Sequence, residues 1–382
     1  MATSLEGFVA IIQQNKTSHY QMYHRKDVYH TDKSFTLWLF IGITCLFLFK
    51  SVAQDTNIEP VRDAYLSIAT DARAAGQGDL GVATSVDAFS QFWNPSKYVF
   101  SEVKSKIALT QILNNGSGLT NFEQLNVTFY NNLEHRSAYA ISVRNYAYGI
   151  DSFVESGAFQ AAHEVAIEGS YALRLSNEFA MSVSGRFISL KGKVPLVDGF
   201  GGESASNLYG IDVAGFFNGN EIAYSKFNGR WRAGFSISNL RGKSLFDNTD
   251  IEIYAPSMLK IGAGFDFIFD QEKKLGVTTE YKMLLDSYVE NEEGERLDFG
   301  LEGSALALGF EFIYRKKISL RSGYSRGLNR VTDTFFTLGS GFHGRYADVD
   351  IAFLLGLSEE ENQFREKLRI SVSLDLAEVL SN

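Results

Sequence analysis

The sequence predicts an all-β protein, a transmembrane antiparallel β-barrel of about 14 strands. Three observations lead to this prediction. From about residue 105 onward, hydrophobicity alternates with a period of two residues. Residues 54–382 contain no cysteine and no apolar run of the roughly 20 residues that a membrane-spanning helix needs. Short and long connections alternate between the predicted strands, as in barrels of the bacterial outer membrane.

The last predicted strand shows the alternation most plainly. Between residues 368 and 376, Leu, Ile, Val, Leu and Leu alternate with Arg, Ser, Ser and Asp. Neighbouring side chains of a strand point to opposite faces, so one face is apolar and the other polar. Similar patterns occupy 164–174, 230–238, 259–269, 275–283, 306–314, 318–324 and 349–355. A secreted β-sandwich shows the same alternation, but so long a strand-like region without a domain break favours one barrel.

The connections and the strand glycines support the same architecture. Asn228-Gly229 and residues 315–317 form short turns, whereas 191–207 and 286–299 are candidate long loops. Glycine weakens a soluble sheet, but in a curved barrel wall it allows kinks and close backbone approach. We therefore expect such roles for glycines inside the strands, among them Gly169, Gly185, Gly234, Gly309 and Gly323.

The first 53 residues have the form of a leader and signal peptide. Lys33 precedes a 15-residue apolar run from Phe35 to Phe49, and Ser51-Val52-Ala53 supplies the small residues of a cleavage site. We expect cleavage near Ala53, and Met22 is a plausible true start. Cys45 lies within the apolar run and is interpreted as an apolar filler.

Composition excludes several classes of function. Lys and Arg number 36 against 45 Asp and Glu, a formal net charge of −9, so a general affinity for nucleic acid is not expected. The single cysteine excludes an intramolecular disulfide and a cysteine-ligated metal site. The acidic runs 290–293 and 359–361 are interpreted as solvated loop charge. The predicted protein has no metal site and no cofactor.

Several patterns that suggest enzymes are interpreted differently here. Residues 76–81 and 339–344 both match G-x-G-x-x-G, yet neither lies between a buried strand and a helix, where that motif binds dinucleotides. His135, His163 and His343 are the only histidines after residue 53, and they lie far apart in the chain. No catalytic triad is predicted from them, and the protein is not expected to be an enzyme. Arg230 and Arg232 are expected to face Glu164 and Glu168 in a polar network inside the barrel.

Residues 71–98 differ from the remainder because they combine small residues, spaced glycines and a Phe-Trp-Asn-Pro run. This segment resembles the start of the FadL superfamily of outer-membrane long-chain fatty-acid transporters and, more closely, the PorV family of the type IX secretion system. The residues that carry the resemblance or form the expected plug are Asp71, Arg73, Gly76, Gly78, Asp79, Gly81, Trp93, Asn94 and Pro95.

The resemblance implies a FadL-like barrel (105–382) with an N-terminal plug or hatch segment (54–104). The three glycines would allow tight packing in the lumen, and Arg73 would pair with a lumen carboxylate such as Glu164 or Glu168. The implied function is protein transport from the cell outer membrane. A shuttle of this family receives secreted cargo proteins through their C-terminal domain at a giant translocon barrel and passes them to a cell-surface sortase.

Two other functions share parts of this pattern. A FadL-like channel for long-chain fatty acids or other hydrophobic compounds would need apolar residues on the inner face of several strands. On the strands whose inner face can be assigned from the sequence, this face carries Arg, Glu, Ser and Asp. The other alternative is a secreted all-β binding or hydrolytic domain, which would need no detergent for solubility.

Overall fold

The computed structural model describes residues 70–380 apart from internal gaps. The gaps are 115–119, 135, 151–161, 195–201, 241–242, 246–251, 255–256, 286–288, 291–295, 298–303, 329–333 and 357–367. The predicted leader and signal peptide, residues 1–53, lie outside the described residues, as does the first part of the predicted plug segment.

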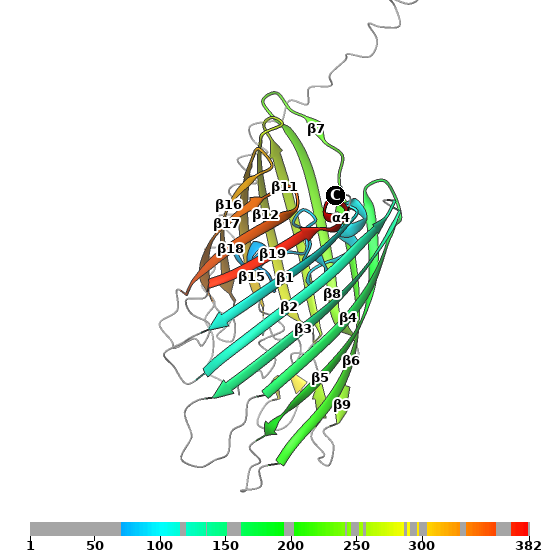
Figure 1. Ribbon diagram of the computed structural model, residues 1–382, viewed down its shortest axis with the longest axis vertical. Coiled ribbons are helices and arrows are strands. Elements are labelled where there is room, and N and C mark those ends of the chain that lie inside the picture. The colour runs from blue at the N-terminus through cyan, green and yellow to red at the C-terminus, as the bar shows by residue number, and fades with distance from the viewer. Residues whose placement is uncertain are drawn as a thin grey trace, which may run out of the picture.

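Fourteen antiparallel strands form a closed barrel (Figure 1). Each strand pairs with the next barrel strand along the chain, and β1 pairs with β19 to close the ring. Leu109 lies opposite Val372 at this seam. The barrel strands are β1 (Ser105–Asn114), β2 (Thr120–Leu133), β3 (Ser137–Ile150), β4 (Ala162–Arg174), β5 (Phe179–Val194), β6 (Gly202–Asn218), β8 (Asn228–Leu240), β11 (Met258–Ile268), β12 (Lys273–Leu284), β15 (Ala305–Tyr314), β16 (Ile318–Gly327), β17 (Phe335–His343), β18 (Ala347–Gly356) and β19 (Leu368–Asp375).

Shorter elements complete the described chain. They are the helices α3 (Ala72–Ala75) and α4 (Leu376–Leu380), the 3-10 helices η2 (Ser90–Phe92) and η3 (Pro95–Phe100), and the strands β7 (Ile222–Ala223), β9 (Lys243–Leu245), β10 (Glu252–Tyr254), β13 (Val289–Glu290) and β14 (Arg296–Leu297). β7 pairs antiparallel with the first two residues of β8, while β9–β10 and β13–β14 are separate hairpins. Within the described residues, no helix is both long and apolar enough to cross a membrane.

The two ends of the barrel differ in their connections. Short turns after β2, β4, β11, β15 and β17 lie at one end of the barrel with α4, and so does the connection between β6 and β8 that contains β7 (Figure 1). At the turn 314–317, Arg315 and Lys316 both have a φ of 54°, and the Lys317 amide donates to the Tyr314 carbonyl at 3.0 Å. Both central residues of a type I′ hairpin turn have positive φ, and this turn suits a two-residue connection between twisted strands.

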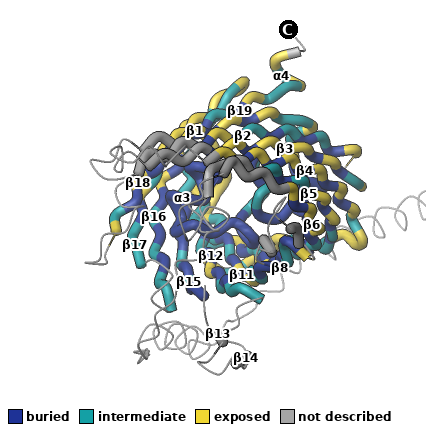
Figure 2. The backbone as a smooth tube through the Cα atoms, turned by 90° about the horizontal axis from the view of Figure 1, so that it is seen from below, coloured by how far each residue is buried: buried dark blue, intermediate teal, exposed yellow. Residues whose placement is uncertain are grey.

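The alternating apolar and polar residues of the sequence lie on opposite faces of the barrel wall. Seen along the barrel axis, buried and exposed residues alternate along each strand (Figure 2). Exposed apolar side chains such as Ile141, Ile167 and Val183 face outward, whereas Glu164, Arg186 and Arg232 are buried. An apolar exterior around a polar interior is the arrangement of an outer-membrane barrel. The prediction of a closed antiparallel barrel of about 14 strands is confirmed.

Candidate functional site

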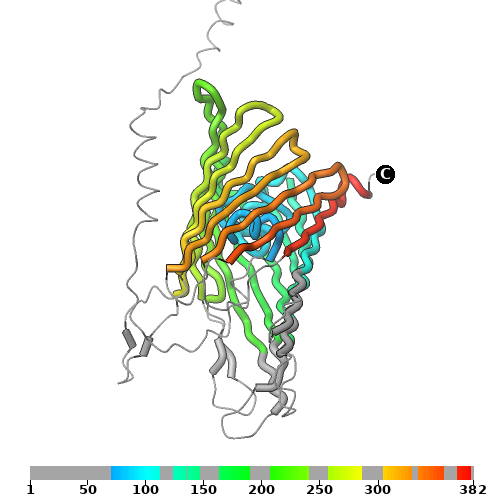
Figure 3. The backbone as a smooth tube through the Cα atoms, turned by 90° about the vertical axis from the view of Figure 1, so that its left-hand side faces the viewer, coloured from blue at the N-terminus to red at the C-terminus, as the bar shows by residue number. Residues whose placement is uncertain are grey.

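The described N-terminal segment, residues 70–101, lies inside the barrel (Figure 3). We call these residues the plug. The helix α3 packs against β17, β18 and β19, while η3 packs against β4 and its neighbours on another part of the wall. Leu80, Val82 and Tyr98 are almost completely buried. The plug therefore crosses the lumen and contacts two separate parts of the wall.

Arg73 lies at the centre of a chain of buried charges that joins the plug to β15, β16 and β18. Its Nε and Nη2 donate to the two oxygens of Glu311 at 2.9 and 2.7 Å, and its Nη1 donates to Asp87 at 3.0 Å. Glu311 also accepts from Arg321 Nε at 2.8 Å, and Arg321 Nη1 donates to Asp350 at 2.6 Å. The two-pronged Arg73–Glu311 contact is the strong, directional form of an arginine–carboxylate pair.

The prediction that Arg73 pairs with Glu164 or Glu168 was wrong. Both of those glutamates lie on β4, which is on a different part of the ring from β15. Glu168 instead accepts from Arg186 at 2.9 Å and from the Gln91 side-chain amide of the plug at 3.0 Å. The expected type of contact, a plug cation on a lumen carboxylate, is present with another carboxylate.

Asp71 joins the two ends of the plug. Its Oδ1 accepts from the Ala74 amide at 2.8 Å and thereby caps α3, while its Oδ2 accepts from Trp93 Nε1 at 2.8 Å. Burial, with a further contribution from the charge of Asp87, raises the pKa of Asp71 from 3.8 to about 7. Asp71, which connects α3 to Trp93 within the plug, is thus a carboxyl group that changes charge near neutral pH.

Glycines of the plug lie where a side chain would collide. A Cβ at Gly81 would lie 2.3 Å from the Trp93 indole, and one at Gly76 would lie 3.1 Å from the Gly339 backbone. Gly78 has a φ of 84°, in the left-handed region that favours glycine, and a Cβ added there would lie 3.0 Å from the Tyr324 backbone. The glycines thus have the tight packing that the sequence suggested.

The Asn94-Pro95 step anchors the second half of the plug. The Asn94 side-chain oxygen accepts from the Ser96 amide and caps η3, with Pro95 at its first position. The Asn94 side-chain amide donates to the carbonyls of Val82 at 3.0 Å and Gly215 at 2.9 Å. One side chain therefore connects η3, an earlier part of the plug and β6.

Asp79 forms a further anchor on the opposite wall. Arg369 Nη1 on β19 donates to Asp79 Oδ1 at 3.0 Å, and both side chains are buried. Asp79 has a φ of 63°, a conformation that aspartate tolerates better than most residues. All nine plug residues singled out from the sequence lie inside the lumen, but they are distributed along the plug rather than gathered at one point.

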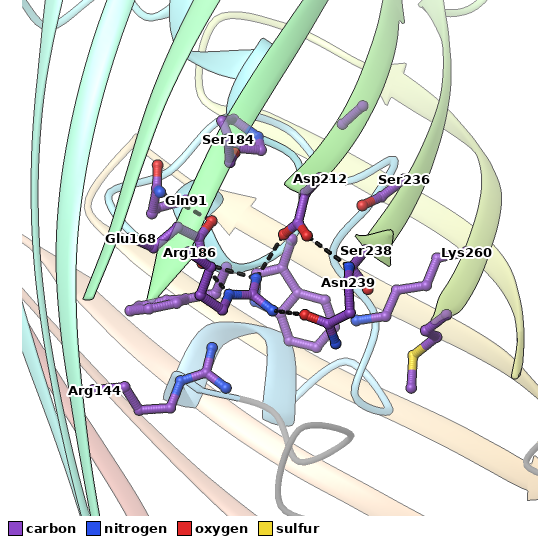
Figure 4. Close-up of a pocket in the computed structure, with 15 residues that line it drawn as sticks. Gln91, Arg144, Glu168, Ser184, Arg186, Asp212, Ser236, Ser238, Asn239 and Lys260 are labelled. Carbon is purple, nitrogen blue, oxygen red and sulfur yellow. Dashed lines mark hydrogen bonds and ion pairs between the residues drawn. The ribbon is translucent and has the colours of Figure 1, made fainter. Parts of the chain in front are cut away.

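A small cavity lies between the plug and the wall formed by β3–β6, β8 and β11 (Figure 4). Its volume is about 30 Å³. Phe92 and Trp93 of the plug form one side of the cavity, while Asn239 and Met258 mark the end of the barrel that carries the long connections. By the usual measure of about 10–15 Å³ per water, it has room for two water-sized atoms.

Charged side chains dominate the lining of this cavity. Arg186 contacts Glu168 at 2.8 Å, Asp212 at 2.6 Å and the Asn239 side-chain oxygen at 2.6 Å (Figure 4). Arg144 lies over the Phe92 ring at 5.1 Å and Lys260 lies over the Trp93 ring at 4.5 Å. A cation over an aromatic face gains electrostatic energy from the ring.

A family comparison identifies the chain. The model of the family "Type IX secretion system protein PorV" matches residues 51–289, more than half of the sequence. The chain belongs to the PorV family. The matched range includes the whole plug and the barrel wall through β12.

Solved structures share the fold of this PorV-family protein at low sequence identity. The toluene transporter TbuX of Ralstonia pickettii aligns with a TM-score of 0.51 and 14% identity, covering 79% of this chain and 96% of that one. The monoaromatic hydrocarbon channel CymD aligns with a TM-score of 0.50 and 12% identity over 80% and 97% of the two chains. A FadL homologue of Pseudomonas aeruginosa gives 0.46 and 11% over 80% and 98%. No curated protein matches the sequence.

The predicted polar network exists, with different pairs. Arg232 donates to Asp266 at 2.8 Å and to the Ala83 carbonyl of the plug at 2.7 Å, rather than to a glutamate of β4. Arg230 contacts Glu221 at 3.4 Å near the short-turn end, and both are partly exposed. The pairing of Arg230 and Arg232 with Glu164 and Glu168 was therefore wrong, because the former lie on β8, with β6 and β5 between β8 and β4.

One histidine lies in a constellation that sequence reasoning missed. His343 Nε2 lies 3.1 Å from Ser319 Oγ, and His343 Nδ1 lies 3.4 Å from Asp348 Oδ1. The order of groups is that of a hydrolytic triad, but Ser319 is 0% exposed, and Asp348 also accepts from Lys106 and Ser373. We interpret the cluster as a hydrogen-bonded tie between β16, β17, β18, β19 and β1.

Metal ligation has little support in the described residues. They contain no group of three or more His, Cys, Asp and Glu side chains that could hold a metal ion. The side chains of the acidic runs 290–293 and 359–361 lie outside the described residues.

Two further anchors were not singled out from the sequence. Glu280 Oε2 on β12 accepts from the amides of Gly81 and Val82, both at 2.8 Å. Lys97 donates to the Gly81 carbonyl at 2.8 Å and to Thr84 Oγ1 at 3.1 Å, and burial lowers its pKa from 10.5 to about 8. The only sequence signal for Glu280 is its place on the polar face of a strand, which it shares with many other residues.

Proposed function

We propose that this protein is an outer-membrane shuttle of the type IX secretion system. It receives secreted proteins through their C-terminal domain at the translocon and transfers them to the cell-surface attachment machinery, including a sortase. The family match over residues 51–289 is the observation that carries this proposal. In this proposal the protein binds and delivers cargo and performs no chemistry on it.

The chemistry of the lumen favours delivery of protein over conduction of apolar molecules. Plug residues contact wall residues through buried ion pairs, among them Arg73–Glu311 and Arg369–Asp79. A path for a hydrophobic compound through the described lumen would require these charged side chains to be desolvated or separated, which is costly. Cargo recognition is therefore assigned to the long connections at the mouth of the barrel, where 191–207 and 286–299 are candidate contacts. Residues 191–194, 202–207, 289–290 and 296–297 belong to strands, and the other residues of these two ranges lie outside the described residues.

Export and location follow from the same proposal. In this proposal the apolar run before Ala53 would direct the chain across the inner membrane, and the apolar exterior of the barrel supports an outer-membrane location. In outer-membrane barrels the short turns face the periplasm. The long connections would then face the exterior, where surface attachment takes place.

A pull-down from the native envelope tests the proposal. The tagged protein is solubilised in detergent from its own cells, and the bound proteins are identified by mass spectrometry. The expected result is recovery of a very large barrel protein, or of secreted proteins that share a C-terminal domain. A barrel that carries only lipid or fatty acid would refute the proposal.

A FadL-like channel for hydrophobic compounds is the second candidate, because TbuX and CymD share the fold. Uptake of a radiolabelled long-chain fatty acid into liposomes distinguishes the two functions. The shuttle predicts uptake no faster than through liposomes without the protein. The channel predicts saturable uptake that increases when the plug is loosened.

A further inference from the structure

We propose that the outer face of the β6–β8 connection binds the anionic headgroup layer of a phospholipid membrane. The connection comprises residues 219–227, contains β7 and lies at the short-turn end of the barrel (Figure 1). This binding requires the outer-membrane location proposed above and goes beyond it, because it assigns a lipid class and a contact surface to one connection. It does not depend on which cargo the protein carries.

Aromatic side chains of the connection and of two neighbouring strands form one cluster. The aromatic cluster comprises Tyr224, Phe227, Trp231, Phe265, Phe267 and Phe269. The rings of Tyr224 and Phe227 stack with their centroids 5.0 Å apart, and Phe227 lies 5.1 Å from Phe267 of β11. A Cβ added to Gly229 would lie 2.4 Å from the Phe265 ring and 2.6 Å from the Tyr224 ring, so the cluster lies directly on the backbone of β8.

The aromatic cluster lies on the outer face of the barrel. Along β8, Arg232 points into the lumen, where it donates to a plug carbonyl at 2.7 Å, so the neighbouring Trp231 points outward. Trp231 and Phe269 are 41% and 48% exposed. Arg230 also alternates with Trp231, and it contacts Glu221 of the connection at 3.4 Å. The connection therefore has an aromatic outer face and a charged inner face, and the apolar exterior of the barrel continues into it.

The turns around the aromatic cluster are positively charged, although the whole chain has a formal net charge of −9. Residues 174–178, 219–230, 269–273 and 314–317 contain seven basic and four acidic side chains, an excess of three positive charges. The basic residues are Arg174, Lys226, Arg230, Lys273, Arg315, Lys316 and Lys317, and the acidic residues are Glu178, Glu221, Asp270 and Glu272. The next residue, Lys274, contacts Asp266 at 3.8 Å inside the barrel and does not belong to this surface.

Three exposed lysines of this surface have no acidic partner. Lys226 lies in the connection, and Lys316 and Lys317 lie in the β15–β16 turn; none of them forms an ion pair with another described residue. The nearby acids are each paired with another basic residue, as Glu221–Arg230, Asp270–Lys273 and Glu272–Arg315. The three ammonium groups can therefore contact phosphate groups outside the protein.

An anionic phospholipid fits both parts of this surface. Aromatic side chains are enriched where a membrane meets water, and basic residues are attracted to anionic headgroups. In the proposed orientation the short turns face the periplasm, so the aromatic cluster would meet the phospholipids on that side of the membrane. A protein partner with an acidic surface is the other possible occupant, and the test below distinguishes the two.

Fluorescence quenching in lipid nanodiscs tests the contact. Phe227→Trp is introduced into a Trp231→Phe background, and Trp231→Phe alone supplies the emission of the other tryptophans for subtraction. We expect lipids brominated next to the headgroup to quench the indole that Phe227→Trp introduces. In the wild type, Trp231 reports whether the wall itself contacts lipid. If heat-modified gel mobility shows that Phe227→Trp does not fold, Tyr224→Trp serves as the second probe.

The headgroup preference is measured with the same probe. Brominated phosphatidylglycerol and brominated phosphatidylcholine are compared at equal mole fraction, and we expect stronger quenching by the anionic lipid. Lys226→Gln should reduce this preference by up to about fivefold, the effect of one basic residue near an anionic membrane surface. The further changes Lys316→Gln and Lys317→Gln should abolish it. Lys104→Gln removes an exposed lysine directly before β1, which is adjacent to neither β8 nor β11, and should leave the preference unchanged.

The outcomes separate this inference from the location and function proposed above. Quenching of Trp231 without quenching at position 227 would overturn the inference, leave the outer-membrane location intact and favour a protein partner on this face. Equal quenching by the two lipids would overturn the assignment of an anionic headgroup. Absence of quenching at both positions would refute the membrane location together with this inference. Failure of the cargo pull-down would leave all of these results unaffected.

Discussion

Trp93 Nε1 donates a 2.8 Å hydrogen bond to Asp71 Oδ2, so the two ends of the plug are joined inside the lumen. The same carboxylate caps α3 through the Ala74 amide. The Asp71 carboxyl group accepts both hydrogen bonds and is fully buried. Burial has the largest effect on its pKa, which it raises. The closed form of the plug therefore depends on pH through Asp71.

The stability of the plug should decrease as the pH rises from about 4 to 7. Burial raises the pKa of Asp71 from 3.8 to about 7, so in this window the folded plug binds more protons than the unfolded one. Stability falls with pH wherever the folded state holds the additional proton. Over the window the loss is on the order of a few kcal/mol, since one pKa unit corresponds to about 1.4 kcal/mol.

The measurement is the thermal unfolding midpoint of the wild type and Asp71→Asn between pH 4 and 8. The difference between the two proteins isolates Asp71 from the other carboxylates. Lys97 acts in a separate window: because its folded pKa is lowered from 10.5 to about 8, it should increase stability as the pH rises from about 8 to 10.5. A wild-type minus Asp71→Asn difference that does not change with pH would contradict the assignment.

Removal of the Arg73 side chain should loosen the plug. Arg73→Ala leaves Glu311 and Asp87 without their plug partner, and the loss of one partner of a buried ion pair costs about 3–5 kcal/mol. Arg73→Lys keeps the charge but loses the two-pronged contact, so an intermediate effect is expected. Arg345→Ala is the matched control, because Arg345 and Glu378 form an exposed pair worth about 0–1 kcal/mol.

Maleimide labelling of a cysteine in the plug reports its position. In a Cys45→Ser background, Ala74→Cys introduces a thiol at a residue that is 4% exposed. We expect slow labelling in the parent and in Arg345→Ala, and fast labelling in Arg73→Ala. Heat-modified gel mobility shows whether the barrel itself remains folded. Slow labelling in a folded Arg73→Ala protein would show that the other anchors suffice.

Sequence patterns predicted the architecture and the faces of the strands, but not the contacts between the plug and the wall. Period-two alternation fixes which side chains share a face, and Glu164 and Glu311 both lie on the inner one. The choice of Glu311 as the partner of Arg73 depends on barrel closure and on the path of the plug. Barrel closure and the path of the plug are not local properties of the chain. The glutamates of β4, which are nearer to Arg73 in the sequence, were therefore chosen wrongly as its partners.

The sequence also could not predict which strand glycines lie against the plug. The sequence placed them in strands and suggested close backbone approach. The structure assigns that role to Gly234, Gly309 and Gly323, whose added Cβ atoms would lie 2.1–2.5 Å from plug atoms. Gly169 and Gly185 form an exposed pair on the outer face, where a Cβ would meet nothing within 4 Å. Only the position of the plug distinguishes the two groups.

A methyl group at Gly323 should displace the plug. The added Cβ would lie 2.1 Å from the backbone of Gln77 and Gly78, which cannot move as a flexible side chain does. Overpacking of this kind typically costs about 1–3 kcal/mol, which corresponds to roughly 5-fold to 150-fold faster labelling of the thiol that Ala74→Cys introduces. Gly169→Ala adds the same methyl group to open space on the outer face and should label at the parent rate. Equal rates in the two variants would contradict this role of Gly323.

Lys316→Gly should stabilise the barrel. Lys316 occupies the second central position of the type I′ turn between β15 and β16 with a φ of 54°, where its side chain causes strain that glycine avoids. Relief of this strain is worth about 1 kcal/mol, the typical cost of a non-glycine residue in the left-handed region. Arg315 is unsuitable for the test because it also contacts Glu272 at 3.2 Å. Urea unfolding in detergent should show a higher midpoint for Lys316→Gly, while the exposed substitution Lys317→Gly in the same turn should lower it or leave it unchanged.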